Sequence, residues 1–66
     1  MNLKTLLSKM SAQKAYIILN DDIVASGYPF FLIQNYQELM GRMVDEIEME
    51  IEIGGNPIMQ IVLLEE

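Results

Sequence analysis

The sequence predicts a small α+β domain in which an antiparallel sheet of about four strands, arranged as two hairpins, packs against two short helices. Two polar or glycine-containing segments each separate a pair of β-branched, aliphatic segments, which is typical of hairpins. One segment alternates strictly between acidic and aliphatic residues, and two others repeat apolar residues at helical spacing. No repeat, linker or low-complexity segment divides the 66 residues, so we expect residues 1–66 to form a single domain.

The amino-terminal segment has the pattern of a short amphipathic helix. Asn2 is suited to cap this helix, because an Asn side chain can accept a hydrogen bond from a free amide of the first turn. We expect the helix to end at about Ser11. Its apolar stripe would consist of Leu3, Leu6, Leu7 and Met10.

The first hairpin is predicted from residues 15–19 and 23–27, which flank the polar segment Asn20-Asp21-Asp22. Asn and Asp favour a turn because both tolerate left-handed backbone angles. The alternative for this segment is a site for a hard cation, but three adjacent residues lack the spacing of a cation-binding loop, so a turn is favoured. Pro29 lacks a backbone donor and should end the second strand near Gly27-Tyr28.

The segment after Pro29 allows two interpretations. Residues 30–33 (Phe-Phe-Leu-Ile) fit either a short buried strand or the start of a helix. Asn35 and Glu38 have the spacing of a capping box, and apolar residues follow at helical spacing. We therefore expect the second helix at about residues 35–43.

The most regular pattern in the chain runs from Asp45 to Ile53, where acidic and aliphatic residues alternate. A strand has a period of two, so it would bury one row of these side chains and leave the other hydrated. The acidic row would contain Glu46, Glu48, Glu50 and Glu52, and the apolar row Ile47, Met49, Ile51 and Ile53. This pattern predicts a half-buried strand with a solvent-facing row of carboxylates.

The last strand should follow a turn at Gly54-Gly55-Asn56-Pro57, where glycine and asparagine supply the positive φ angles of a hairpin connection. Residues 58–64 are apolar on both faces apart from Gln60. Either this strand is central and both faces are covered, or its second face is a contact surface. The face that could make such a contact contains Ile58, Val62 and Leu64.

Charge is unevenly distributed along the chain. The net charge is −6, all four basic residues precede residue 43, and seven of the ten acidic residues follow it. Such a field repels nucleic acid and anionic membranes and attracts basic protein surfaces. We therefore expect neither direct nucleic-acid binding nor membrane association, and a basic surface of a host protein as the partner.

Composition also limits the chemistry and location of the protein. The chain contains no Cys and no His, so neither a disulfide nor a zinc site of the usual type is available, and oligomerisation is the remaining way to stabilise so small a core. The acidic residues alternate along a strand and do not converge, which argues against catalysis. We expect a non-enzymatic protein with no cofactor and no metal. No apolar run approaches the roughly 20 residues of a membrane span and no signal peptide is recognisable, so we expect a cytoplasmic location.

The candidate partner-binding residues are Asp45, Glu46, Glu48, Glu50 and Glu52. Carboxylates two residues apart on a strand lie about 6.8 Å apart. Each strand of B-form DNA presents one phosphate per roughly 3.4 Å of rise, so this row can stand in for part of a phosphate strand in a nucleic-acid-binding cleft. The alternative is that the acids only hydrate the strand and discourage edge pairing. The lack of any cation after Arg42 favours a binding role, because neighbouring like charges destabilise a strand.

Several segments together resemble the small uncharacterised proteins carried by phages and prophages of Gram-positive bacteria. They are the Leu-rich opening (residues 3–10), the Tyr-Ile-Ile-Leu-Asn-Asp-Asp hairpin (16–22), Gly27-Tyr28, Gln37-Glu38-Leu39 and the acidic terminal hairpin. Pro29 and the aromatic residues after it depart from that pattern. In size and acidity the chain is also similar to phage anti-CRISPR proteins. This resemblance implies an inhibitor that occupies a nucleic-acid-binding or recognition site on a host defence protein, and it transfers no residue roles.

Three functional hypotheses follow. The first is an acidic, phage-derived inhibitor that docks its acidic strand onto a basic host surface. The second is a homo-oligomeric accessory module, such as a homodimer, that pairs through Ile58, Val62 and Leu64 while the glutamates only maintain solubility. The third is an antitoxin or regulator that needs its partner to fold.

Overall fold

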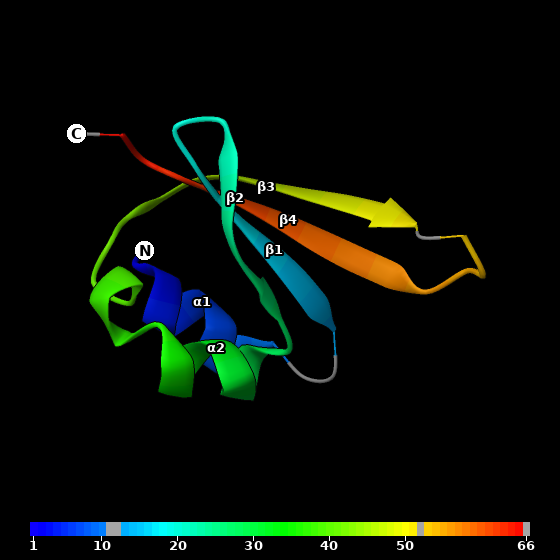
Figure 1. Ribbon diagram of the computed structural model, residues 1–66, viewed down its shortest axis with the longest axis horizontal. Helices are drawn as coiled ribbons and strands as arrows, with labels where there is room; N and C mark the ends of the chain where they lie inside the picture. The colour runs from blue at the N-terminus through cyan, green and yellow to red at the C-terminus, as the bar shows by residue number, and fades with distance from the viewer. Residues whose placement is uncertain (11–12, 52, 66) are drawn as a thin grey trace.

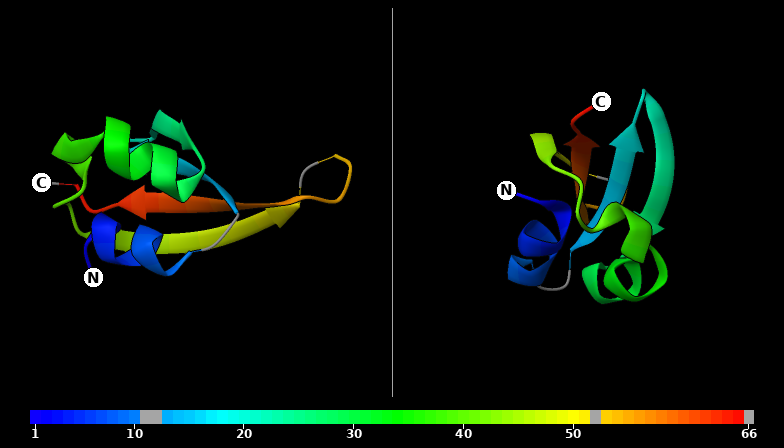
Figure 2. Two further views of the ribbon diagram at one scale, coloured as in Figure 1. Left: turned by 90° about the horizontal axis from the view of Figure 1, so that it is seen from below. Right: turned by 90° about the vertical axis from the view of Figure 1, so that its left-hand side faces the viewer.

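A computed structural model describes residues 1–10, 13–51 and 53–65. Four strands form one sheet in the order β2-β1-β4-β3, and both α-helices lie on the same face of it (Figures 1 and 2). The predicted α+β class is thus confirmed. The elements are α1 (Leu3–Lys9), β1 (Lys14–Leu19), β2 (Asp22–Gly27), α2 (Pro29–Asn35), the 3₁₀ helix η1 (Gln37–Leu39), β3 (Val44–Ile51) and β4 (Pro57–Leu63). Among the described residues, no helix has the length and apolar composition needed to cross a bilayer.

The two predicted hairpins meet in the middle of the sheet. β1 pairs antiparallel with β2, β3 pairs antiparallel with β4, and the inner strands β1 and β4 run parallel to each other. The sheet is therefore mostly antiparallel, with one parallel pair where the hairpins join. β4 is central, as one of the two interpretations of its apolar sequence expected, but the described helices cover only one of its faces, so the expectation that both faces are covered is not met.

Helix α1 forms as its sequence predicts. The Asn2 side chain accepts a hydrogen bond from the backbone amide of Thr5 at 2.9 Å, which makes Asn2 the N-cap. Leu3 and Leu7 are fully buried, while Leu6 and Met10 are partly buried against the same core. The helix itself ends at Lys9, and the predicted end at Ser11 lies outside the described residues.

The first hairpin also confirms its prediction. Asn20 and Asp21 have φ values of 53° and 66°, and Leu19 pairs directly with Asp22, so the two residues form a tight left-handed turn. A β-bulge beside Ile17 and Ile18 leaves Val24 as the extra residue of β2. β2 ends at Gly27, two residues before Pro29, as expected from the proline.

The second helix lies earlier than predicted. α2 begins at Pro29, which occupies the first helical position, where its fixed φ and missing donor are favourable. Residues 30–33 are therefore helical, and the expected helix over residues 35–43 is wrong, because only the short η1 forms there. Asn35 is the last residue of α2, and its side chain donates to the Phe31 carbonyl oxygen at 2.9 Å and so does not cap a new helix.

The core lies between the helices and the inner part of the sheet. β1 contributes Ala15 and Ile17, and β4 contributes Ile61 and Leu63, all at most 1% exposed. They pack with residues of both helices and neighbouring segments: Leu3, Leu7, Ala25, Leu32 and Met40. The helices are only seven residues long, so this core is small.

The β3–β4 hairpin extends past both helices, as the left-hand view of Figure 2 shows. β3 begins close to the predicted start, but Ile53, expected in its apolar row, lies in the turn after the strand. The expectation that the strand is half-buried is wrong. Ile47, Met49 and Ile51 are 47%, 55% and 77% exposed, although they lie on the same side of the sheet as the helices. Alternation sets which side these residues occupy, but no described helix reaches far enough to cover them.

Candidate functional site

The acidic row, defined here as Glu46, Glu48 and Glu50, lies on the face of the sheet opposite both α-helices, which we call the open face. Their cross-strand neighbours are Val62, Gln60 and Ile58 of β4, whereas Ile47 pairs with the core residue Ile61. Adjacent partners in a ladder share a face, so the register fixes this orientation. All three glutamates are exposed.

A β-bulge at the start of β3 produces this orientation. Val44 pairs with the buried Leu63 and packs against the core, and the register then shifts between Val44 and Glu46. Without the shift, the period of two would place Glu46 on the same side as Val44. The bulge therefore lets Val44 join the core while the glutamates face solvent.

The acidic row borders an apolar strip on the open face. In register, Glu48 lies beside Gln60, Gln60 beside Tyr16, and Tyr16 beside Ser26, which spans all four strands. The next row places Glu46 beside Val62, and Val62 beside Ile18. Tyr16, Ile18 and Val62 are half-buried, so the face combines a partly apolar centre with carboxylates at one edge.

No internal cation neutralises the acidic row among the residues that the structure describes. The side-chain hydrogen bonds there are made by Asn2, Ser8 and Asn35, and no ion pair forms. Lys14 is the nearest basic residue in register, separated from Glu50 by Ile58, and its Nζ lies 5.7 Å from the centre of the Tyr16 ring. The three carboxylates therefore face solvent without an ion-pair partner among the described residues.

The other two predicted partner-binding residues stand apart from this row. Asp45 falls within the bulge, is exposed and has no partner in the β3–β4 register. Glu52 lies outside the described residues. The site that the structure brings together thus contains three of the five predicted carboxylates.

The predicted oligomer interface does not form one continuous surface. Ile58 and Val62 share the open face, but Ile58 is only 5% exposed and Val62 is half-buried. Leu64 follows the end of β4, where its amide donates to the Met43 carbonyl oxygen at 2.8 Å. Leu64 therefore lies at the end of the β3–β4 hairpin that is farthest from the turn between these two strands.

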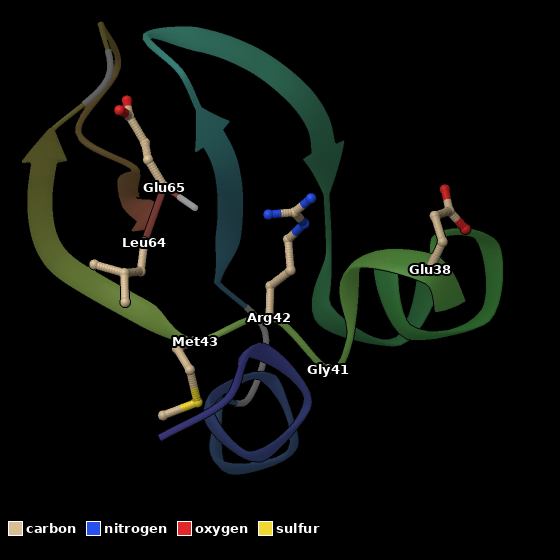
Figure 3. Close-up of a pocket in the computed structure, with 6 residues that line it drawn as sticks. All are labelled: Glu38, Gly41, Arg42, Met43, Leu64 and Glu65. Carbon is tan, nitrogen blue, oxygen red and sulfur yellow. The ribbon is translucent and has the colours of Figure 1, made fainter.

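A pocket of about 360 Å³ lies beside Leu64, at the end of the β3–β4 hairpin farthest from its turn (Figure 3). The Arg42 side chain extends between Leu64 and Glu65 on one side and Glu38 on the other. Gly41 and Met43 complete the lining. No sequence pattern predicts this pocket, because its residues come from η1, the segment before β3 and the segment after β4.

Exposed apolar side chains form two further features that the sequence analysis missed. Tyr28, Phe30 and Phe31 are exposed at the start of α2, because the helical phase set by Pro29 turns Leu32 into the core instead. A helix start placed at Pro29 would have predicted this arrangement. The second feature is the apolar row, defined as Ile47, Met49 and Ile51, whose exposure depends on where the helices end.

For the segment Asn20-Asp21-Asp22 a turn was favoured over a cation site, and Asn20 and Asp21 do adopt the backbone angles of a turn. Among the described residues, no three His, Cys, Asp or Glu side chains gather closely enough to hold a metal ion.

Comparison of the chain with protein-family models, curated proteins and solved structures found no match. The function must therefore be inferred from the geometry of the surfaces described above.

Proposed function

We propose that the protein is a non-enzymatic binding protein that docks its acidic row onto a basic surface of another protein. The observation that supports this most strongly is the common orientation of Glu46, Glu48 and Glu50 on one exposed face, with no ion pair among the described residues. Carboxylates at a spacing of about 6.8 Å match a row of Lys or Arg side chains that normally contacts a phosphate backbone.

The position of the acidic row suits association with a large partner. β3 is an edge strand of a hairpin that extends past the helices, so a partner can approach it without contacting the rest of the domain (Figure 2). A row of like charges steers an oppositely charged surface and accelerates encounter, and salt screens this effect. We therefore expect the association rate to fall as ionic strength rises.

The resemblance to phage proteins supports a nucleic-acid-binding protein of the host as the partner. An acidic row that occupies a nucleic-acid-binding cleft competes directly with the phosphate backbone. The protein would then act as an inhibitor, in the manner that its similarity to anti-CRISPR proteins implies. No covalent chemistry is required for this mode of action.

Affinity capture from a lysate of the organism that encodes the protein tests the proposal. The wild-type protein and an E46Q/E48Q/E50Q variant serve as baits, and captured proteins are identified and quantified by mass spectrometry. A matched control, D22N/E38Q/E65Q, makes the same change in net charge at exposed acidic residues outside the row. We expect the control to retain a basic partner that the row variant loses.

Purified partner and protein then give the decisive measurement. We expect the row variant to bind at least tenfold more weakly than the control, chiefly through a slower association rate at low salt. Equal affinity of the two variants would contradict the proposal. Circular dichroism checks that both variants keep the fold.

Self-association through the open face is the competing proposal, favoured by the partly apolar centre at Tyr16, Ile18 and Val62. Sedimentation at low micromolar concentration tests it, with V62K as the disrupting variant. A dimer that V62K converts to monomer would support this proposal. A monomeric wild-type protein would contradict it.

A further inference from the structure

The outer edge of β3 provides both backbone groups and side chains for an additional strand. We infer that the partner binds there as an extended segment in which basic residues alternate with apolar ones. This inference rests on the proposed function, because it takes the acidic row as the charged half of the same site. It goes further in two ways. The apolar row forms the second half of the binding site, and backbone hydrogen bonds of β3 align the partner segment along the edge.

The backbone of β3 supports this inference first. Among the described strands, β3 pairs with β4 alone and stands at the end of the sheet order. Its register with β4 is regular from Glu46 to Ile51, after the bulge. An edge strand directs alternate N–H and C=O groups away from its neighbour, where they can pair with another chain. The edge therefore offers an ordered ladder of hydrogen-bonding groups beyond the bulge.

The protein already uses the start of this edge in the same way. The Val44 amide donates to the Met1 carbonyl oxygen at 2.9 Å, and the Leu3 amide donates to the Arg42 carbonyl oxygen at 2.9 Å. These two bonds form an isolated antiparallel bridge between Asn2 and Met43. The amino-terminal residues thus pair with the outer edge just before β3, and the next part of the edge, from Glu46 onward, is where an added strand would continue.

The side chains of β3 specify what that strand should contain. Residues of an added strand would lie beside the acidic row on the open face and beside the apolar row on the other face. Lys or Arg on the added strand would complement the acidic row. Val, Ile or Leu would cover the apolar row, whose members are 47–77% exposed. An alternating basic and apolar segment meets both requirements at once, whereas a uniformly basic segment meets only one.

A second copy of the chain fits this edge poorly. Symmetric antiparallel pairing of two β3 strands keeps equivalent faces together, so glutamates of one copy would lie beside glutamates of the other. Like charges directly opposite each other destabilise a sheet. The acidic row therefore selects against self-pairing and in favour of a cationic strand.

Three synthetic peptides of matched composition test the inference. The first alternates Lys and Val over seven residues, beginning and ending with Lys. The second has the same residues in two blocks, with three Val before four Lys. The third is the alternating peptide with an N-methyl group on every backbone amide, so that neither of its edges can donate. Titrations followed by two-dimensional NMR of the ¹⁵N-labelled protein report both the affinity and the residues that respond.

We expect the alternating peptide to bind at least tenfold more tightly than the block peptide. Amides of β3 that do not pair with β4 should become protected from hydrogen exchange. N-methylation of the alternating peptide should abolish the preference. A variant with the apolar row replaced, I47S/M49S/I51S, should lose the preference while keeping the weaker, charge-driven binding of the block peptide. Its NMR spectrum verifies the fold.

The possible failures are distinguishable. Equal binding of the alternating and block peptides, weakened in E46Q/E48Q/E50Q, would overturn strand addition and leave charge-driven docking intact. If no peptide binds but the captured partner still requires the acidic row, strand addition would again be overturned and charge-driven docking would stand. Peptide binding that E46Q/E48Q/E50Q does not weaken would contradict the proposed function as well. A homodimer that pairs through β3 would also overturn the inference.

Discussion

β1 and β3 both direct alternate side chains toward the side of the sheet that carries the helices, but these side chains differ in burial. Ala15 and Ile17 of β1 are fully buried, whereas the equivalent row of β3, Ile47, Met49 and Ile51, is about half to three-quarters exposed. The difference lies in the layer above them, because α1 and α2 cover β1 and end before the outer part of β3 (Figure 2). Alternation in a strand thus determines which residues share a face, and the neighbouring layer determines whether that face is buried.

The two regions should therefore contribute unequally to stability. The covered region, comprising α1, α2, β1, β2 and the part of β4 at Ile61–Leu63, contains eight of the ten buried hydrophobic residues of the described chain, and Met40 joins the same core cluster. The projecting hairpin segment, comprising residues 47–51 and 53–57, contributes no member of the core cluster. Its described part is held by pairing with β4, which is anchored in the core at its other end.

The largest expected effect contrasts truncations in the two regions. L7A removes a fully buried side chain and should lower the free energy of unfolding by about 2–5 kcal/mol, a large part of the roughly 3–10 kcal/mol expected for a chain of this length. I51A removes an exposed side chain and should change that free energy by less than about 0.5 kcal/mol. Urea denaturation followed by circular dichroism measures both. Similar losses would show that the projecting hairpin segment is buried in solution.

A smaller effect is expected from the contact between β2 and α2. Gly27 has a φ of 143°, and a Cβ atom there would lie 3.0 Å from Cδ2 of Phe31. G27A should therefore destabilise the protein by about 1–3 kcal/mol, through backbone strain and displacement of the Phe31 ring. G41A is the matched control, because a Cβ at Gly41 has no atom within 4 Å, and thermal unfolding should distinguish the two variants. Equal stability would mean that α2 does not pack against the end of β2.

The cap of α1 should have an effect of about 1 kcal/mol. N2A removes the acceptor for the Thr5 amide and leaves that donor without a partner in the helix. N2D keeps an acceptor at the same position and should restore stability, which makes it the control. Chemical denaturation of the three proteins measures the difference, and a loss in N2D equal to that in N2A would argue against capping.

The smallest expected effect has the opposite sign. E46Q/E48Q/E50Q should raise the free energy of unfolding by a few tenths to about 1 kcal/mol, because it removes repulsion between neighbouring like charges. Added salt should stabilise the wild-type protein more than the variant, since screening weakens the same repulsion. Denaturation at low and high ionic strength checks both expectations. A destabilised variant would indicate that the glutamates make stabilising contacts.

Local sequence patterns predicted much of the fold for identifiable reasons. Asn2 and the leucine stripe specify α1 because capping and helical spacing act within one helix. Asn20-Asp21 and Gly54-Gly55 mark the turns because both pairs adopt positive φ angles. The second helix was misplaced because the spacing of Asn35 and Glu38 matches a capping box, whereas Pro29 supplies an equally valid start six residues earlier.

The candidate site was predicted only in part. Alternation correctly grouped Glu46, Glu48 and Glu50 on one face of a strand. It did not indicate the bulge that separates Asp45 from them, since a bulge depends on how Val44 fits the core. The apolar row was expected to be buried, because a pattern of exposed and buried positions cannot show the length of the helices that cover a sheet.

The amino-acid sequence by itself determined the turns, the cap of α1, the strand identity of residues 45–51 and the shared face of the three glutamates, all of which depend on interactions between residues close in the chain. Only the tertiary structure decided the parallel pairing of β1 with β4, the edge position of β3 and the exposure of both its rows. These features depend on contacts between distant segments. They also depend on the reach of two seven-residue helices, which cannot cover a hairpin that extends beyond them.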